Sequence, residues 1–200
     1  RYIQDEVRDL GIYPYFHALE SRQDTEVIME GKRRIMLGSN NYLGLTTNEA
    51  VIKAGMHAYE TLGSGCSGSR FLRKDAVVTF STGFQSNLGI ISAIVGLHDY
   101  VIMDRENHAS LYDGCKLSYG KMLRYQHNDM ADLEKKLQKV PETAGCLIVT
   151  DGVFSMGGDI ANLPEICALA QKYGARVMVD DAHGLGVIGE GGRGTASYYG

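Results

Sequence analysis

The amino-acid sequence predicts an α/β fold in which a mostly parallel sheet is flanked by helices on both faces. Short apolar segments rich in Val, Ile and Leu alternate with segments of helical periodicity. Strands that are almost continuously apolar are typical of parallel sheets with both faces covered. Because such sheets bind ligands beyond the carboxyl ends of their strands, we expect functional residues directly after each strand.

The alternation begins with strand 77–80 (VVTF), which a helix at 84–95 follows. Strand 100–104 (YVIMD) comes next, and a helix runs from about 108 to 119. The short strand 121–125 (KMLRY) completes this half of the series.

The second half of the alternation starts with segment 129–140, whose apolar residues recur at helical spacing. Strand 146–150 (CLIVT) follows, and then a helix at 163–173 with Asn162 as its expected N-cap. Strand 176–180 (RVMVD) closes the series. We find no internal repeat, low-complexity tract or linker.

The composition excludes several classes of protein. Among 200 residues, 44% are hydrophobic and 22% charged, which is enough apolar material for a sizeable core. The net charge of −4 does not indicate a basic surface for binding nucleic acid or an anionic membrane, so we expect any membrane contact to be peripheral. The four cysteines form no Cys-x-x-Cys pair, which argues against a metal site or a disulfide framework. With no signal peptide or membrane-spanning run, we expect a cytoplasmic protein.

Residues after three of the strands allow a functional and a purely structural interpretation. Gly83 and Phe84 open a helix whose free N–H groups would suit a phosphate, although Gly83 could be a simple turn residue. His108 follows strand 100–104 and could be a ligand contact, a solvated loop residue or a helix cap. Ser155 lies in the long turn after strand 146–150, where it could contact a ligand or serve only the turn.

The last strand ends in Asp180, and His183 follows three residues later. A carboxylate at a strand end can keep a heterocyclic nitrogen protonated, and a nearby imidazole can bond an adjacent phenolic oxygen. These are the requirements of pyridoxal phosphate (PLP) acting as an electron sink.

A dinucleotide-binding fingerprint is the competing interpretation of this region, because Gly184, Gly186 and Gly189 match G-x-G-x-x-G. In that fingerprint the glycines should open a helix directly after the strand. Here the pattern begins four residues past Asp180 and runs into the glycine-rich segment 190–194, which cannot propagate a helix. We therefore reject a nucleotide-binding oxidoreductase.

Six motifs in order give the sequence a resemblance to the α-oxoamine synthases. These fold-type I PLP enzymes join an amino acid to an acyl-CoA thioester with loss of carbon dioxide. The motifs are GSNNYLGL (38–45), GSGCSGSR (63–70), STGF (81–84), NHAS (107–110), TDGVFSMGGD (150–159) and VDDAH (179–183). The resemblance implies a fold-type I large domain.

The resemblance assigns catalytic roles to three residues. Asp180 would pair with the pyridine nitrogen of PLP, and His183 would bond its phenolic oxygen. His108 would stack on the pyridine ring and position the substrate carboxylate.

The resemblance also assigns binding roles. Gly83 and Phe84 would lie against the cofactor near its phosphate, and Ser155 would contact it. Asn40 is the candidate for binding the amino-acid carboxylate or the acyl group. A homodimer with its active site at the subunit interface is implied.

Within the family, segments 13–16 (YPYF), 38–46 (GSNNYLGLT) and 81–89 most resemble members that condense L-serine with palmitoyl-CoA. The product would be 3-ketodihydrosphingosine, the first intermediate of sphingolipid synthesis. The alternatives are 2-amino-3-ketobutyrate CoA ligase, 5-aminolevulinate synthase and 8-amino-7-oxononanoate synthase activities. An alternative of another class is a non-catalytic partner subunit that lacks the Schiff-base lysine.

The sequence departs from the family pattern at several points. The Schiff-base lysine of the family lies downstream of VDDAH and is not among the 200 residues, nor is the C-terminal small domain. Family members carry a further helix-length segment between the points that correspond to Leu72 and Arg73, so we expect an internal gap there, and His17 stands where relatives often carry arginine. We expect an N-terminal segment, 1–45, and a partial PLP-binding large domain, 46–200.

Overall fold

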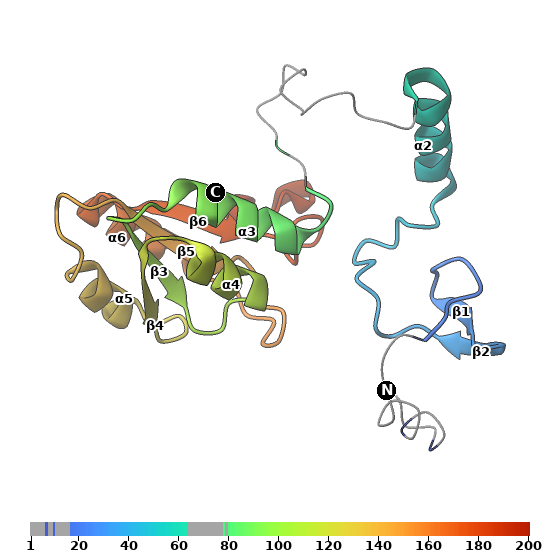
Figure 1. The fold of residues 1–200 in the computed structure, drawn as a ribbon, viewed down its shortest axis with the longest axis horizontal. Coiled ribbons are helices and arrows are strands. Elements are labelled where there is room, and N and C mark those ends of the chain that lie inside the picture. The colour runs from blue at the N-terminus through green and yellow to red at the C-terminus, as the bar shows by residue number, and fades with distance from the viewer. Residues whose placement is uncertain (1–6, 8–9, 11–16, 64–77, 79) are drawn as a thin grey trace. The chain divides into compact units, whose positions relative to one another are not determined.

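The computed structural model describes residues 7, 10, 17–63, 78 and 80–200, which belong to two compact units, Arg1–Ser67 and Gly68–Gly200. Each unit is considered by itself (Figure 1). The predicted boundary at residue 45 stays a prediction. The predicted internal gap at 72/73 and the YPYF segment lie outside the described residues.

The first unit contains a hairpin and a helix that the sequence patterns did not predict. Strands β1 (Glu26–Met29) and β2 (Lys32–Ile35) pair antiparallel. Glu30 and Gly31 connect them with φ angles of 51° and 71°, the left-handed conformation that two-residue hairpin turns need.

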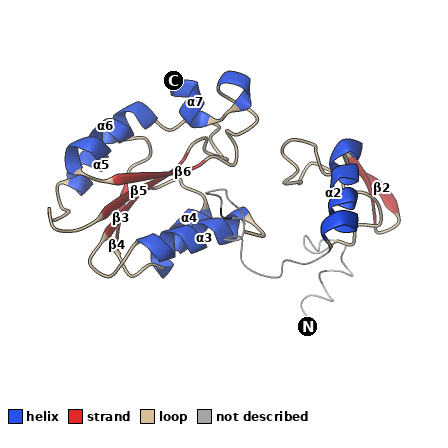
Figure 2. Ribbon diagram, turned by 90° about the horizontal axis from the view of Figure 1, so that it is seen from above, coloured by secondary structure: helices blue, strands red, loops and turns tan. Residues whose placement is uncertain are grey.

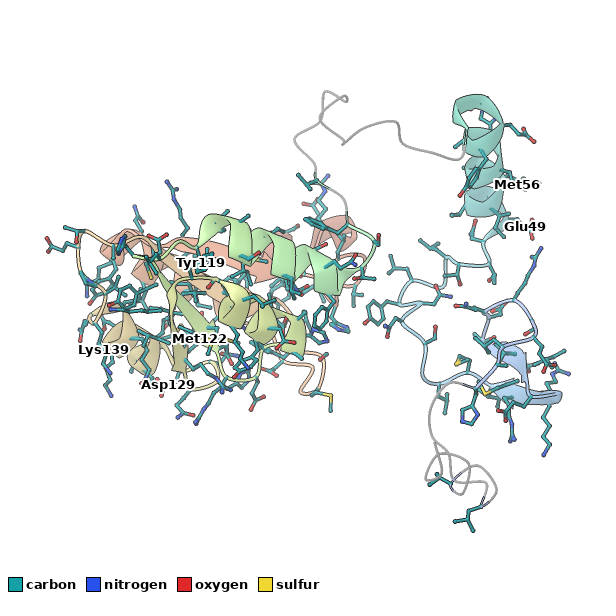
Figure 3. The ribbon with its side chains drawn as sticks, viewed as in Figure 1. Glu49, Met56, Tyr119, Met122, Asp129 and Lys139 are labelled. Atoms are coloured by element: carbon teal, nitrogen blue, oxygen red, sulfur yellow. The ribbon has the colours of Figure 1, made fainter. Side chains whose placement is uncertain are left out.

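Helix α2 (Glu49–Leu62) begins at Asn48, whose side chain accepts hydrogen bonds from the N–H groups of Ala50 and Val51. Figure 3 labels Glu49 in the first turn of this helix, where it pairs with Arg22 Nη1 at 2.9 Å.

The second unit is built on a four-stranded parallel sheet, as the sequence predicted. Its strands are β3 (Tyr100–Asp104), β4 (Lys121–Tyr125), β5 (Cys146–Asp151) and β6 (Arg176–Asp180), in the order β4-β3-β5-β6. Its helices are α3 (Gly83–Ile94), α4 (Ala109–Leu117), α5 (Met130–Leu137), α6 (Leu163–Tyr173) and α7 (Thr195–Tyr199), with a 3₁₀ turn at Glu190–Gly192. None of the described helices has the length and apolar character needed to cross a membrane.

The helices cover both faces of the sheet, α3 and α4 on one and α5 and α6 on the other (Figure 2). Alternate residues of each strand point to opposite faces, so neighbours in the sequence belong to different cores. Val101 and Met103 pack with α3 and α4, whereas Ile102 packs with α5 and α6. The predicted three-layer α/β arrangement is therefore confirmed.

The predicted strand at 77–80 is not confirmed by the residues that are described there. Val78 and Phe80 lie outside any strand, and residues 77 and 79 lie outside the described part of the chain. The Phe80 ring instead packs on Gly89 of α3, where a Cβ would lie 2.7 Å from Cε1 of that ring.

Gly114 allows helix α4 to approach α3 closely. A Cβ at this position would lie 2.9 Å from the carbonyl oxygen of Asn87 and 2.9 Å from Cδ1 of Ile91. Such distances are shorter than van der Waals contact, so α3 and α4 could not keep this spacing around a larger residue. The contact brings the side chain of Asn87 toward α4.

We predict that Gly114→Ala destabilises the protein by about 1–3 kcal/mol, because overpacking outweighs the better helix propensity of alanine. Urea denaturation would measure the change in the free energy of unfolding. Gly55→Ala in α2 is the matched control, because a Cβ there meets no atom within 4 Å and should cause no loss. A Gly114→Ala protein as stable as the original would contradict the close approach.

Candidate active site

Three neighbouring strands of the sheet end in aspartate. Asp104 ends β3, Asp151 ends β5 and Asp180 ends β6, and Asp151 and Asp180 are paired in the strand register. Asp104 and Asp151 are buried, whereas Asp180 is half-buried. Charged carboxylates at such positions need hydrogen-bond donors, and the surrounding loops and helices supply them.

Asp180 and His108 are connected through two intermediate side chains. Asn87 Nδ2, on α3, donates to Asp180 Oδ2 at 2.7 Å and to Ser110 Oγ at 2.8 Å. Ser110 Oγ lies 2.7 Å from Nδ1 of His108. The sequence did not identify Asn87 or Ser110, because helical spacing alone does not show which polar residue faces a strand end 93 positions away.

His108 is the N-cap of α4, as one of its sequence interpretations proposed. Its Nδ1 accepts the backbone N–H of Ser110 at 3.2 Å, and its own backbone N–H donates to Asp151 Oδ2 at 2.8 Å. The residue is exposed. Its backbone is thus held by the neighbouring strand end while its ring stays accessible.

The carboxyl group of Asp151 has a raised pKa. Burial raises its pKa to about 6, with the charge of Asp180 acting in the same direction and the His108 N–H opposing it. Asn107 holds the strand end as well, since its Oδ1 accepts the Asp151 N–H at 3.0 Å.

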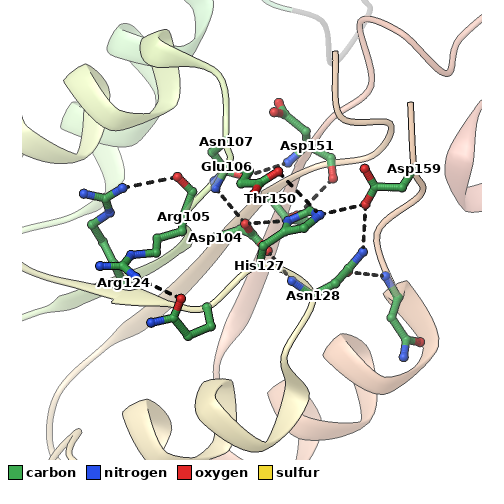
Figure 4. A network of polar contacts seen from close by, with 12 residues as sticks. Asp104, Arg105, Glu106, Asn107, Arg124, His127, Asn128, Thr150, Asp151 and Asp159 are labelled. Atoms are coloured by element: carbon green, nitrogen blue, oxygen red, sulfur yellow. Dashed lines mark hydrogen bonds and ion pairs between the residues drawn. The ribbon is translucent and has the colours of Figure 1, made fainter. Parts of the chain in front are cut away.

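Asp104 belongs to a second polar cluster, which fixes the loop after β5 (Figure 4). His127 contacts Asp104 Oδ1 through Nδ1 at 3.0 Å and Asp159 Oδ2 through Nε2 at 2.8 Å. Since carboxylates only accept, both ring nitrogens must donate, which requires the protonated imidazole. Burial alone would lower the pKa of His127, but the bonds and charges of Asp104 and Asp159 outweigh it and raise that pKa.

Asn128 completes this cluster with φ of 50°. Its N–H donates to Asp104 Oδ2 at 2.9 Å, and its Nδ2 donates to Asp159 Oδ2 at 3.1 Å. The cluster braces the 151–159 loop, in which Ser155 is exposed. The signal for His127 and Asn128 was available in the sequence, because they follow strand 121–125 directly.

Gly83 and Phe84 form the first turn of α3, one turn before Asn87. Thr82 caps this helix, its Oγ1 accepting the N–H of Gln85 at 3.1 Å. Gly83 is exposed, with no atom within 4 Å of a Cβ built on it. An accessible helix N-terminus therefore lies beside the Asp180 strand end, as expected for an anion site.

The structure gives fewer contacts for the remaining residues that the sequence analysis singled out. His183 is half-buried, three residues beyond Asp180. Asn40 is exposed and belongs to the first unit, so its position relative to the strand ends is not determined. His17, also in the first unit, contacts Glu30 Oε1 at 3.1 Å.

Comparison of the sequence with known families and proteins gives matches over nearly its whole length. The family described as aminotransferase class I and II matches residues 9–197. The chain is 50% identical to a serine palmitoyltransferase of Sphingobacterium spiritivorum, over 99% of this chain and 54% of the relative. It is 44% identical to an 8-amino-7-oxononanoate synthase of Thermoanaerobacter pseudethanolicus, over 98% and 54% respectively.

The fold comparison agrees with these matches. A serine palmitoyltransferase from S. paucimobilis with a bound PLP–myriocin aldimine superposes with a TM-score of 0.86 and 39% identity. The match covers 100% of this chain and 55% of that one, so the chain spans about half the length of the relatives it matches. The resemblance to the α-oxoamine synthases and the fold-type I large domain are thereby confirmed.

We predict that the pH dependence of stability reports the titration of Asp151. Its pKa rises from 3.8 to about 6 on folding, so the folded protein binds this proton more tightly. The stability gained from that proton is complete below about pH 4 and is lost as the pH rises to about 6.

Urea denaturation of Asp151→Asn and the original protein at several pH values between 4 and 7 would test this. The original should lose up to about 3 kcal/mol relative to the variant across that window. Glu142→Gln, which removes an exposed carboxylate, is the control and should show no such difference. Parallel curves for the original and Asp151→Asn would contradict the raised pKa.

Proposed function

Because the chain belongs to the aminotransferase class I and II family, we propose that it forms the cofactor-binding part of a PLP-dependent acyltransferase. The reaction we propose is the decarboxylative condensation of L-serine with palmitoyl-CoA to 3-ketodihydrosphingosine. The single observation that carries the proposal is the strand-end arrangement that joins Asp180 to His108, beside the open N-terminus of α3.

The donor and acceptor chemistry at this edge fits PLP. Asp180 accepts N–H groups of Asn87 and Ala182, and a carboxylate at this position would keep a proton on a pyridine nitrogen. Gly83 leaves room for an anionic group at the first turn of α3, which suits a phosphate. When bound there, PLP supplies an electron sink for a carbanion at the amino-acid Cα.

The residues of this chain would bind and orient the reactants. His108 would lie over the pyridine ring and hold the substrate carboxylate, and His183 would bond the phenolic oxygen. Gly83 and Phe84 would contact the cofactor near its phosphate. Ser155 would add a further contact from the loop that the His127 cluster braces.

Several further assignments remain proposals. Asn40 would bind the amino-acid carboxylate or the acyl group, and the protein would act as a homodimer in the cytoplasm with at most peripheral membrane contact. The Schiff-base lysine would be supplied by a part of the polypeptide outside these 200 residues. The alignment with the S. spiritivorum relative spans 216 positions, more than the residues of this chain, which supports a missing internal segment without locating it.

A second candidate function is 8-amino-7-oxononanoate synthase, in which alanine replaces serine. The relative of that name at 44% identity favours it over the glycine-using members. The identity of 50% to serine palmitoyltransferase favours L-serine.

We predict that L-serine perturbs the visible absorption spectrum of the complete, PLP-loaded polypeptide at lower concentration than alanine or glycine. Separate titrations of the three amino acids would measure this. A stronger response to alanine would move the assignment to the second candidate. Absence of any Schiff-base band would leave the partner subunit as the better interpretation.

We also predict that Asp180→Asn lowers kcat by on the order of a hundredfold or more, because an amide cannot hold the ring-nitrogen proton. The free energy of unfolding should change by less than about 2 kcal/mol, since the amide oxygen can still accept the N–H of Ala182. Steady-state kinetics and urea denaturation would measure the two effects. Asp113→Asn on α4 is the control, and normal turnover in Asp180→Asn would contradict the assigned role.

A further inference from the structure

The hydrogen-bonded connection between Asp180 and His108 has a fixed direction of donation. Its two intermediate residues are almost fully enclosed, with Asn87 5% exposed and Ser110 1% exposed. Each comes from a different helix, Asn87 from α3 and Ser110 from α4, and the close contact at Gly114 brings those helices together. Buried polar groups of this kind are retained only where their bonds are satisfied.

The negative charge of Asp180 determines how the Asn87 amide is turned. A carboxylate can only accept hydrogen bonds, so the amide nitrogen of Asn87, and not its oxygen, must face Asp180 Oδ2 at 2.7 Å. The second hydrogen of the same nitrogen is directed to Ser110 Oγ at 2.8 Å. Both donor hydrogens of the amide are then used.

The Ser110 hydroxyl donates onward, because Nδ1 of His108 accepts the backbone N–H of Ser110 and therefore carries no proton. Its oxygen already accepts from Asn87, and its nearest remaining partner is Nδ1 of His108 at 2.7 Å. The backbone N–H of Ser110 also donates to that nitrogen, at 3.2 Å. Two donors directed at Nδ1 exclude a proton there, so the neutral ring carries its proton on Nε2.

We propose that Asn87 and Ser110 are positioning residues that transmit the charge of Asp180 to His108 and hold its imidazole in the Nε2–H tautomer. The exposed ring of His108 then presents a hydrogen-bond donor rather than an acceptor to an incoming carboxylate. This consequence rests on the proposed function, in which the ligand is an amino acid. The tautomer itself follows from the contacts alone.

The tautomer can be measured without cofactor or substrate. Selective ¹⁵N-histidine labelling of the complete apo polypeptide, with His108→Gln to assign the signal, distinguishes a protonated from an unprotonated ring nitrogen. We expect unprotonated Nδ1 and protonated Nε2 in the original protein. Ser110→Ala and Asn87→Leu should each admit a detectable fraction of the Nδ1–H form, whereas Ser118→Ala, at the other end of α4, should not.

A kinetic measurement tests the consequence for binding. In Ser110→Ala, loss of the fixed Nε2–H donor should raise KM for L-serine by about three- to tenfold, a larger change than that in kcat. If Asn87 and Ser110 had only a structural role, their variants would be less stable and a smaller fraction of the enzyme would be active, but KM would not rise selectively. Ser110→Ala removes one oxygen atom and serves as the milder variant if Asn87→Leu does not fold.

Two results would overturn the proposal: an Nδ1–H or mixed ring in the original protein, or variants with the original tautomer and KM. Failure of the proposed function looks different. A wild-type protein that binds the amino acid poorly or turns over no L-serine would refute that function, while the apo spectra would still decide the tautomer.

Discussion

The organisation of this site depends on one electrostatic constraint, the placement of three carboxylates at the ends of neighbouring buried strands. A parallel sheet that ends in Asp104, Asp151 and Asp180 concentrates negative charge where water is scarce. Each carboxylate must therefore receive N–H donors, and these come from different elements. Asp104 uses the turn after β4, Asp151 uses the start of α4, and Asp180 uses α3. The hydrogen bonds to these three carboxylates thus fix the loops and helix ends that surround the candidate cofactor site.

The same requirement distinguishes Asp104, which is held by structural contacts, from Asp180, the proposed cofactor contact. Asp104 is fully buried and is held on both oxygens by the His127 and Asn128 cluster, which leaves it no capacity for a ligand. Asp180 is half-buried and is bonded by Asn87, which is connected to His108 through Ser110. Asp151 lies between them; its carboxylate accepts the backbone N–H of His108, and burial raises its pKa. Buried carboxylates with a raised pKa are common near catalytic centres, where they cost stability but serve the reaction.

Sequence reasoning succeeded where the information is local. Strand 176–180 and helix 163–173 were predicted with the observed bounds, because an apolar run and helical spacing are written in consecutive residues. It failed at β1 and β2, where KRRI lacks any alternation and the Glu30–Gly31 turn is not a common hairpin signal. Asn87 was missed for another reason, since its meaning comes from a partner 93 residues away. Long-range hydrogen bonds of this kind depend on helix packing that no local pattern encodes.

In the glycine-rich segment after β6, packing against a neighbouring side chain explains why glycines are needed. Asp181, the neighbour of Asp180, accepts both the hydroxyl and the N–H of buried Thr195, so it closes the 184–194 loop upon itself. A Cβ at Gly184 or Gly194 would overlap the Asp181 carboxylate, and Gly194 also has φ of 92°, which favours glycine. Gly184 of the apparent G-x-G-x-x-G pattern is therefore required by a side-chain clasp rather than by a pyrophosphate. Of two adjacent aspartates, Asp181 holds the loop and Asp180 is the one we propose to contact the cofactor, a division that accounts for an apolar strand ending in both.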